Sequence, residues 1–180
     1  MLDAIPEPAR GVYLAMALLG LRPSEALALH PAQLRGDGTM SIDRARADRT
    51  LGTDAPRTKT RRARTLPVPD ELAQWIEEHV SRHQRLDGGP LFRLPTTGGP
   101  WNETSLRRWW YSACEAAGVP QIGVYEGTKH TLGTELRREG VPLDVIQAVF
   151  GHADARSTER YARLADTAVI AALTPRKPRR

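Results

Sequence analysis

The chain has 180 residues, 40% of them hydrophobic, and its 26 lysines and arginines outnumber 21 acidic residues to give a net charge of +5. This composition excludes an intrinsically disordered chain, and the length suits one folded domain with a core of its own. No apolar run reaches the roughly 20 residues of a membrane span, and a single cysteine excludes an internal disulfide framework.

Two helices are predicted at the start of the chain. The dense apolar residues of 8–21 indicate a buried helix. Pro23 follows at a position where a first-turn proline is tolerated, and Ser24 and Glu25 open a second helix that we expect to run through about Leu29.

A small antiparallel sheet is expected next. The glycines and aspartate of 36–38 mark a turn, and residues 39–68 are short, alternating and rich in arginine and threonine. This pattern predicts three small strands, of which the last covers 64–68. The first third of the chain therefore holds the β structure of a protein that is otherwise mainly α, an α+β class.

The rest of the chain reads as helical. Asn102 or Thr104 caps one of these helices, and Gly118 and Gly140 mark two helix ends. The predicted helices cover residues 70–83, 102–117, 127–138 and 142–150, a short stretch opened by Ser157, and 166–173.

The positive charge is concentrated in two places. Five basic residues lie within eight positions that hold no acid, and four more close the chain. Such clusters are typical of nucleic-acid binding, although a solvated loop and tail would look the same. The residues that we expect to contact DNA on this basis are Arg57, Arg61, Arg62 and Arg64.

Cutting DNA without a metal requires a nucleophile, fixed cations around the phosphate oxygens, and an acid for the leaving oxygen. Four segments supply such groups in order. They are Gly-Leu-Arg-Pro-Ser-Glu with Arg22, Thr-Lys-Thr-Arg-Arg-Ala-Arg with Lys59, Tyr-Glu-Gly-Thr-Lys-His with Lys129, and Phe-Gly-His-Ala-Asp-Ala-Arg-Ser-Thr-Glu-Arg-Tyr with His152 and Tyr161.

Together these segments resemble the catalytic domain of tyrosine recombinases, which include phage integrases and Xer-type recombinases. The nine-residue step from His152 to Tyr161 also fits that family. The resemblance implies that Tyr161 is the nucleophile and that Arg22 clamps the phosphate. It further implies that His152 contacts the scissile phosphate and that Lys59 donates a proton to the leaving oxygen.

Two positions depart from the family's His-x-x-Arg motif. The arginine is Lys129 here, which keeps the charge but loses the two-pronged fork that binds two phosphate oxygens. The histidine is Glu126, an anion that we expect to turn aside or to pair with Lys129 or a neighbouring base. His130 is interpreted as structural support.

The resemblance implies site-specific cleavage and rejoining of double-stranded DNA through a 3′-phosphotyrosine, as in integration or recombination. It implies no metal and no nucleotide cofactor, and a homotetramer on paired DNA sites. We expect the catalytic domain over 1–174, a basic tail over 175–180, and no N-terminal core-binding domain. Without a visible secretory signal, a cytoplasmic protein is expected.

Two other functions remain open. The same fold with a weakened clamp would be a DNA-binding domain that does not cut, which Glu126 and Lys129 favour. The same chemistry without strand exchange would be a nicking and closing enzyme that resembles type IB topoisomerases. Ordinary structural roles also remain for single residues: Arg22 would pair with Glu25, and Tyr161 would pack against the core.

The remaining histidines and tryptophans fit structural roles. His30, His79 and His83 lack the spacing of a metal site. The tryptophans, at 75, 101, 109 and 110, are expected in the core, with Trp101 the one candidate for a place near DNA.

Overall fold

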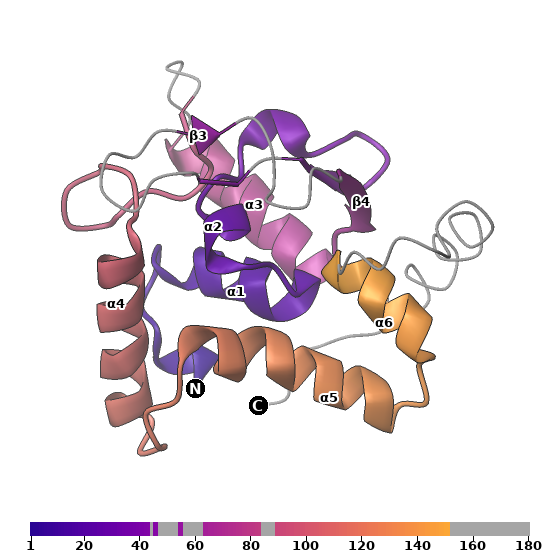
Figure 1. Cartoon of the computed structure of the whole chain (residues 1–180). Helices are drawn as coiled ribbons and strands as arrows, with labels where there is room; N and C mark the ends of the chain where they lie inside the picture. Colours follow the sequence, from indigo (N-terminus) through magenta and orange to yellow (C-terminus); the bar gives the residue numbers. More distant parts are fainter. Residues whose placement is uncertain (44, 47–53, 56–62, 84–88, 152–180) are drawn as a thin grey trace.

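The computed structural model describes residues 1–43, 45–46, 54–55, 63–83 and 89–151. The fold is mostly helical with short antiparallel strands, as the sequence predicts. Helix α1 (Arg10–Leu19) lies at the centre, and α3 (Asp70–His83), α4 (Glu103–Ala116), α5 (Thr131–Arg138) and α6 (Leu143–Phe150) surround it (Figure 1). No helix in the described part of the chain is long and apolar enough to cross a membrane.

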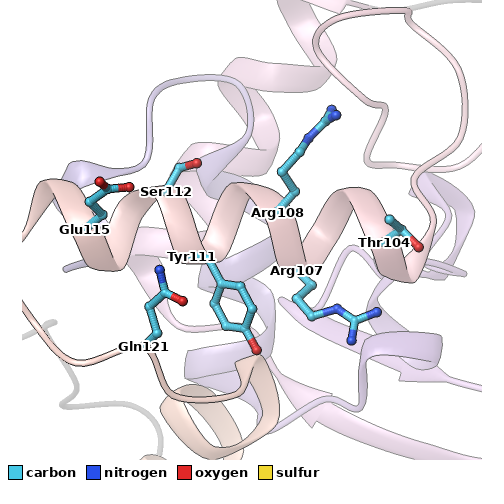
Figure 2. A pocket seen from close by; sticks show the side chains of 7 residues that line it. All are labelled: Thr104, Arg107, Arg108, Tyr111, Ser112, Glu115 and Gln121. Atoms are coloured by element: carbon cyan, nitrogen blue, oxygen red, sulfur yellow. The ribbon is translucent and has the colours of Figure 1, made fainter.

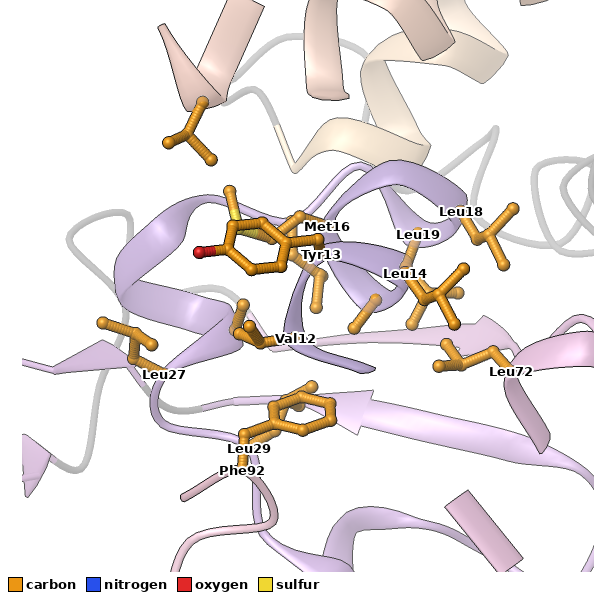
Figure 3. Close-up of a cluster of buried hydrophobic side chains, with 14 of the residues drawn as sticks. Val12, Tyr13, Leu14, Met16, Leu18, Leu19, Leu27, Leu29, Leu72 and Phe92 are labelled. Carbon is orange, nitrogen blue, oxygen red and sulfur yellow. The ribbon is translucent and has the colours of Figure 1, made fainter. Parts of the chain in front are cut away.

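Helix α1 forms the middle of the core because nearly every face of it is apolar. Eight of its ten residues are buried, which is the pattern of a helix covered on all sides. Figure 3 shows its side chains in one cluster with Leu27 and Leu29 of the following segment and with Leu72 and Phe92. Gly20 ends the helix in the left-handed conformation, with φ 62°.

Three aromatic side chains close one end of this core. The ring of Tyr13 stacks on Trp110 with centroids 5.6 Å apart and meets the edge of Trp101 at 6.1 Å. Trp101 and Trp110 are 2% and 0% exposed, which confirms their placement in the core. The polar tips find carbonyl acceptors, since Tyr13 Oη donates to Leu106 O at 2.6 Å and Trp110 Nε1 to Ile122 O at 2.9 Å.

The strands form two antiparallel pairs. Strand β1 (Thr39–Ile42) pairs with β4 (Arg64–Pro67), so that buried Met40 lies opposite buried Leu66. Strand β2 (Ala45–Arg46) pairs with β3 (Asp54–Ala55). The last predicted strand is confirmed, but the expected number of three is wrong, because the described residues alone hold four strands, two of them only two residues long. Strands that short contain too little alternation to be read from the sequence.

The predictions for α3 and α4 are confirmed to within a residue or two. The amide of Ser105 donates to Asn102 Oδ1 at 2.7 Å, which identifies Asn102 as the N-cap of α4. Gly118 follows the helix with φ 64°.

The predicted helix over 23–29 is shorter in the structure. Helix α2 (Pro23–Ala26) is a single turn, and the chain then enters the 3₁₀ turn η2 (Pro31–Gln33). After α2 the Ala28 N–H donates to Glu25 O at 3.1 Å and the Leu29 N–H to Ala26 O at 3.3 Å, which are the tighter bonds of a 3₁₀ turn, and the extended His30, with ψ 143°, then precedes a proline. Another 3₁₀ turn, η1 (Leu2–Ala4), precedes α1.

The predicted helix over 127–138 is divided into two parts. Its first turn, η3 (Glu126–His130), is a π-helix, and α5 follows it directly. Gly127 lies against the ring of Trp110, where a side chain would not fit. Helix α6 ends at Gly151, with φ 61°. The predicted helices from Ser157 onward lie outside the described residues.

Candidate functional site

The predicted site residues divide into two groups. Arg22, Arg64, Glu126 and Lys129 lie in the described part of the chain. The others lie outside the described residues, and their placement stays a prediction: Arg57, Lys59, Arg61, Arg62, His152 and Tyr161.

Arg22 is held at the start of α2 by a carboxylate three residues ahead. Pro23 sets the first helical turn, and the Arg22 backbone N–H donates to Glu25 Oε2 at 2.9 Å. The side chain also pairs with Glu25, with Nη1 3.2 Å from Oε1. The Arg22 side chain is 31% exposed while that of Glu25 is 1% exposed, so the arginine lies between the buried carboxylate and solvent.

Arg64, the first residue of β4, binds the same carboxylate from the other side. Its Nη1 and Nη2 donate to the two oxygens of Glu25 at 3.0 and 2.8 Å. This is the two-pronged geometry that makes arginine–carboxylate pairs strong. The Arg64 side chain is 11% exposed. The sequence suggests that Arg64 contacts DNA, which stays a prediction; in the structure its guanidinium binds Glu25 and Val149 O inside the protein.

Two cations also bind the last carbonyls of α6. Arg64 Nε donates to Val149 O at 3.0 Å, and Lys129 Nζ donates to Phe150 O at 3.0 Å. Carbonyls at a helix C-terminus lack partners within the helix and carry partial negative charge, so both contacts are favourable. The residues Arg22, Glu25, Arg64 and Lys129 are called the Glu25 cluster below.

Lys129 is buried almost completely, at 1% exposed. Its Nζ lies 4.6 Å from the centre of the Phe150 ring and 5.7 Å from that of Tyr125. Burial lowers the pKa of Lys129 to about 7, and the nearby charges of Arg22 and Arg64 add to that effect while Glu25 opposes it. The Lys129 amine is therefore close to half protonated at neutral pH.

Glu25 stays ionised in this setting. Burial acts to raise its pKa, but the hydrogen bonds and charge of Arg64, together with the backbone N–H and charge of Arg22, hold the pKa below its ordinary value. Two arginines against one carboxylate leave one positive charge in excess, and protonated Lys129 adds a second. The Glu25 cluster can therefore attract an anion, which would meet Arg22 first.

Glu126 does not take part in the cluster. Its carboxylate turns back over Gly123, and the ion pairs found between described residues do not join it to Lys129. His130 is exposed and packs the edge of its ring on Tyr125, with centroids 4.8 Å apart. Because the Glu126 carboxylate points toward Gly123, it neither neutralises the cations of the Glu25 cluster nor faces an anion that they would bind.

Sequence reasoning missed the central role of Glu25 and the anchoring role of Arg64. The pairing of Glu25 with Arg22 was open as an ordinary helix-start contact, and it exists, but its carboxylate also binds Arg64. A signal for Glu25 was its third position in a helix opened by Arg22 and Pro23. Arg64 gave no such signal, since its partners are 39 and 85 residues away.

An open hollow of about 550 Å³ lies elsewhere, along the outer face of α4. Figure 2 shows the side chains that line it, among them Arg107 and Tyr111 of the helix and Gln121 of the following loop. Helix α4 lies across α1 from α6 in Figure 1, so the hollow is separate from the Glu25 cluster at the end of α6. Within the described ranges, no three histidine, cysteine or acidic side chains gather as a metal site would require.

Comparison with known proteins points to one family. The model of the phage integrase family matches residues 3–168. The tyrosine recombinase XerC of Mesorhizobium japonicum is 29% identical over 142 residues, which are 79% of this chain and 42% of that protein. The tyrosine recombinase XerD of Neisseria meningitidis serogroup B is 28% identical over 158 residues, or 84% of this chain and 48% of that protein.

Among solved structures, the Tn1549 transposon integrase in complex with a circular intermediate DNA superposes with a TM-score of 0.72. The match covers 98% of this chain and 59% of that chain at 16% identity, which shows a shared fold. The chain spans less than half the length of the two curated relatives above.

Proposed function

The chain belongs to the phage integrase family, and on that premise we propose that it cuts and rejoins double-stranded DNA at specific sites through a 3′-phosphotyrosine. The observation that carries the proposal is the Glu25 cluster. It places two arginines and a lysine around one carboxylate, with Arg22 partly exposed above them. A phosphodiester in cleavage gains negative charge, which fixed cations of this kind stabilise.

In the proposed reaction the Tyr161 phenol loses its proton to solvent, its oxygen forms a bond to the scissile phosphorus, and the bond from phosphorus to the 5′ oxygen breaks. Lys59 gives a proton to that oxygen, so a free 5′-hydroxyl leaves. The phosphotyrosine conserves the bond energy, and attack by a 5′-hydroxyl of a partner strand reverses the step. Exchange between strands would require protomers on paired DNA sites, for which a homotetramer is proposed.

Arg22, Lys129 and His152 hold the phosphate charge in this proposal. Arg22 presents a partly exposed guanidinium, whereas the Lys129 ammonium donates to Phe150 O beneath it. Lys129 therefore acts as a charge behind Arg22, and it does so only when protonated.

The proposal is tested by trapping the covalent intermediate. The chain is incubated with labelled duplexes of random sequence, each with one nick, so that the short strand released by cleavage near the nick diffuses away. An adduct that survives denaturing electrophoresis is expected from the wild type and from Tyr111→Phe, a control tyrosine on α4. No adduct is expected from Tyr161→Phe, because the nucleophile is gone. An adduct that persists in that variant would place the nucleophile elsewhere.

A second function is favoured by one specific observation. Lys129 is buried and its ammonium is bound to Phe150 O, so it lacks direct access to a phosphate in this structure. A clamp weakened in this way fits a domain that binds DNA without cutting it. Tight binding to the duplex library with no adduct from the wild type would establish that function and exclude the first.

A further inference from the structure

Three segments of the chain meet at one guanidinium. Arg64 begins β4 and binds Glu25 of α2 through both Nη atoms, at 3.0 and 2.8 Å. Its Nε binds Val149 O at the end of α6, at 3.0 Å. Arginine offers N–H groups in one rigid plane, so a contact at one edge fixes the direction of the contact at the other.

The end of α6 is shaped around the same side chain. A Cβ on Gly151 would lie 2.8 Å from Arg64 Nη1 and 3.1 Å from its Cζ. Gly151 also has φ 61°, which side chains of other residues disfavour. Two independent features, the space taken by Arg64 and the left-handed backbone, therefore require glycine immediately before His152.

Each of the three segments adjoins a residue of the proposed reaction. Arg22 caps α2 three residues before Glu25. Lys59 precedes Arg64 by five residues, and His152 follows Gly151. The guanidinium of Arg64, with its side chain 11% exposed, lies where these segments come together.

We propose that Arg64 is a positioning residue, not a DNA contact: it ties the start of α2, the start of β4 and the end of α6 into one unit, which holds Arg22 and the end of α6 that precedes His152 in the sequence. Lys129 also holds the end of α6, because its Nζ donates to Phe150 O, the carbonyl that follows Val149 O. The inference rests on the proposed function for its predicted effect on rate, because displaced groups can slow DNA cleavage only if the protein cleaves DNA.

The test compares Arg64→Lys with the wild type and with Arg82→Lys. Arg64→Lys keeps the charge beside Glu25 but cannot hold both Glu25 oxygens and Val149 O at once. Arg82→Lys makes the same change in an ion pair with Glu78 on the exposed face of α3, where the Arg82 side chain is 70% exposed. Amide hydrogen exchange is measured without DNA, and single-turnover adduct formation and DNA affinity are measured on the nicked library.

Faster exchange is expected in Arg64→Lys at the end of α6 and the start of α2, and in neither segment of Arg82→Lys. The adduct rate constant is expected to fall by about ten- to a hundredfold, since small displacements of reacting groups have effects of that size. DNA affinity and its dependence on salt are expected to stay as in the wild type. A positioning role thus changes the rate of the chemical step and leaves binding alone.

Two results would overturn the inference. One is weaker DNA binding with a salt slope reduced by about one, the mark of a lost phosphate contact. The other is unchanged exchange in both segments. If the wild type forms no adduct, the proposed function fails, while the exchange data still decide whether the tie exists. Gly151→Ala perturbs the contact between Arg64 and the end of α6 without altering a charge. It is expected to speed amide exchange at the start of α2 as well.

Discussion

The aromatic cluster and the Glu25 cluster both enclose polar groups, and they are built in opposite ways. The aromatic cluster of Tyr13, Trp101 and Trp110 is neutral, and the hydroxyl of Tyr13 and the indole N–H of Trp110 each reach a backbone carbonyl. Burial raises the pKa of Tyr13, which keeps its hydroxyl neutral. The Glu25 cluster instead places three cationic side chains around one carboxylate.

This difference indicates that the aromatic cluster, and not the Glu25 cluster, stabilises the fold. Neutral groups with all partners inside the protein give a core without an electrostatic penalty. Burial of a cation disfavours the folded state, and neighbouring cations add to the cost; burial first, and then the charges of Arg22 and Arg64, lower the pKa of Lys129. A cluster of this kind is most readily explained by an anion that completes it, as a DNA phosphate would under the proposed function.

The largest expected effect comes from the aromatic cluster. Trp110→Ala removes a side chain that is 0% exposed and stacked on Tyr13, and we expect it to lower the free energy of unfolding by about 3–5 kcal/mol. Urea unfolding followed by circular dichroism measures this. Trp109→Ala, one position along α4 and only partly buried, is the matched control and should cost less. Equal losses of unfolding free energy in the two variants would contradict the claim that the aromatic cluster is a main source of stability.

A smaller effect, of opposite sign, is expected in the Glu25 cluster. Lys129→Met should raise the free energy of unfolding by about 1–3 kcal/mol near pH 6, because removal of an unbalanced buried cation outweighs the lost bond to Phe150 O. The folded-state pKa of about 7 lies below the ordinary 10.5. Between these values the unfolded chain holds a proton that the folded chain has released, so wild-type stability rises with pH.

The pH dependence distinguishes this account from simple repacking. The advantage of Lys129→Met should shrink as the pH rises from about 6 to about 10, and urea unfolding at several pH values measures it. A constant difference between the two proteins, or a variant less stable than the wild type at every pH, would show that Lys129 carries no penalty in the folded state.

The smallest expected effect concerns the rate of cleavage. Lys129→Arg restores a cation that stays protonated and has a planar fork, and we expect single-turnover adduct formation to rise by about five- to tenfold, which corresponds to about 1 kcal/mol. The gain should be larger near pH 8 than near pH 6, since wild-type Lys129 is mostly neutral at the higher pH. An unchanged or lower rate at both pH values would show that the lysine does not limit the reaction.

The elements that could be predicted from the sequence are those whose causes are local. Helices α3 and α4 follow from apolar spacing and from the Asn102 cap, whereas the first helix, expected over 8–21, ends earlier, at Leu19. The π-helical turn η3 could not be predicted, because Gly127 packs on Trp110 from a distant part of the chain.

The same limit applies to the candidate site. Arg22 and Lys129 are visible as cations within motifs, and both lie in the Glu25 cluster. The role of Arg64 depends on partners from α2 and α6, which only tertiary structure brings together. A basic segment in a sequence therefore does not show which arginines face DNA and which hold the protein together.

The most direct test of the central claim is to locate the covalent bond. The adduct of the wild-type chain with the nicked library is digested with protease and nuclease, and the modified peptide is sequenced by mass spectrometry. The account predicts a single nucleotide-bearing peptide that contains Tyr161. A nucleotide on any other residue, or firm DNA binding with no modified peptide, would contradict it.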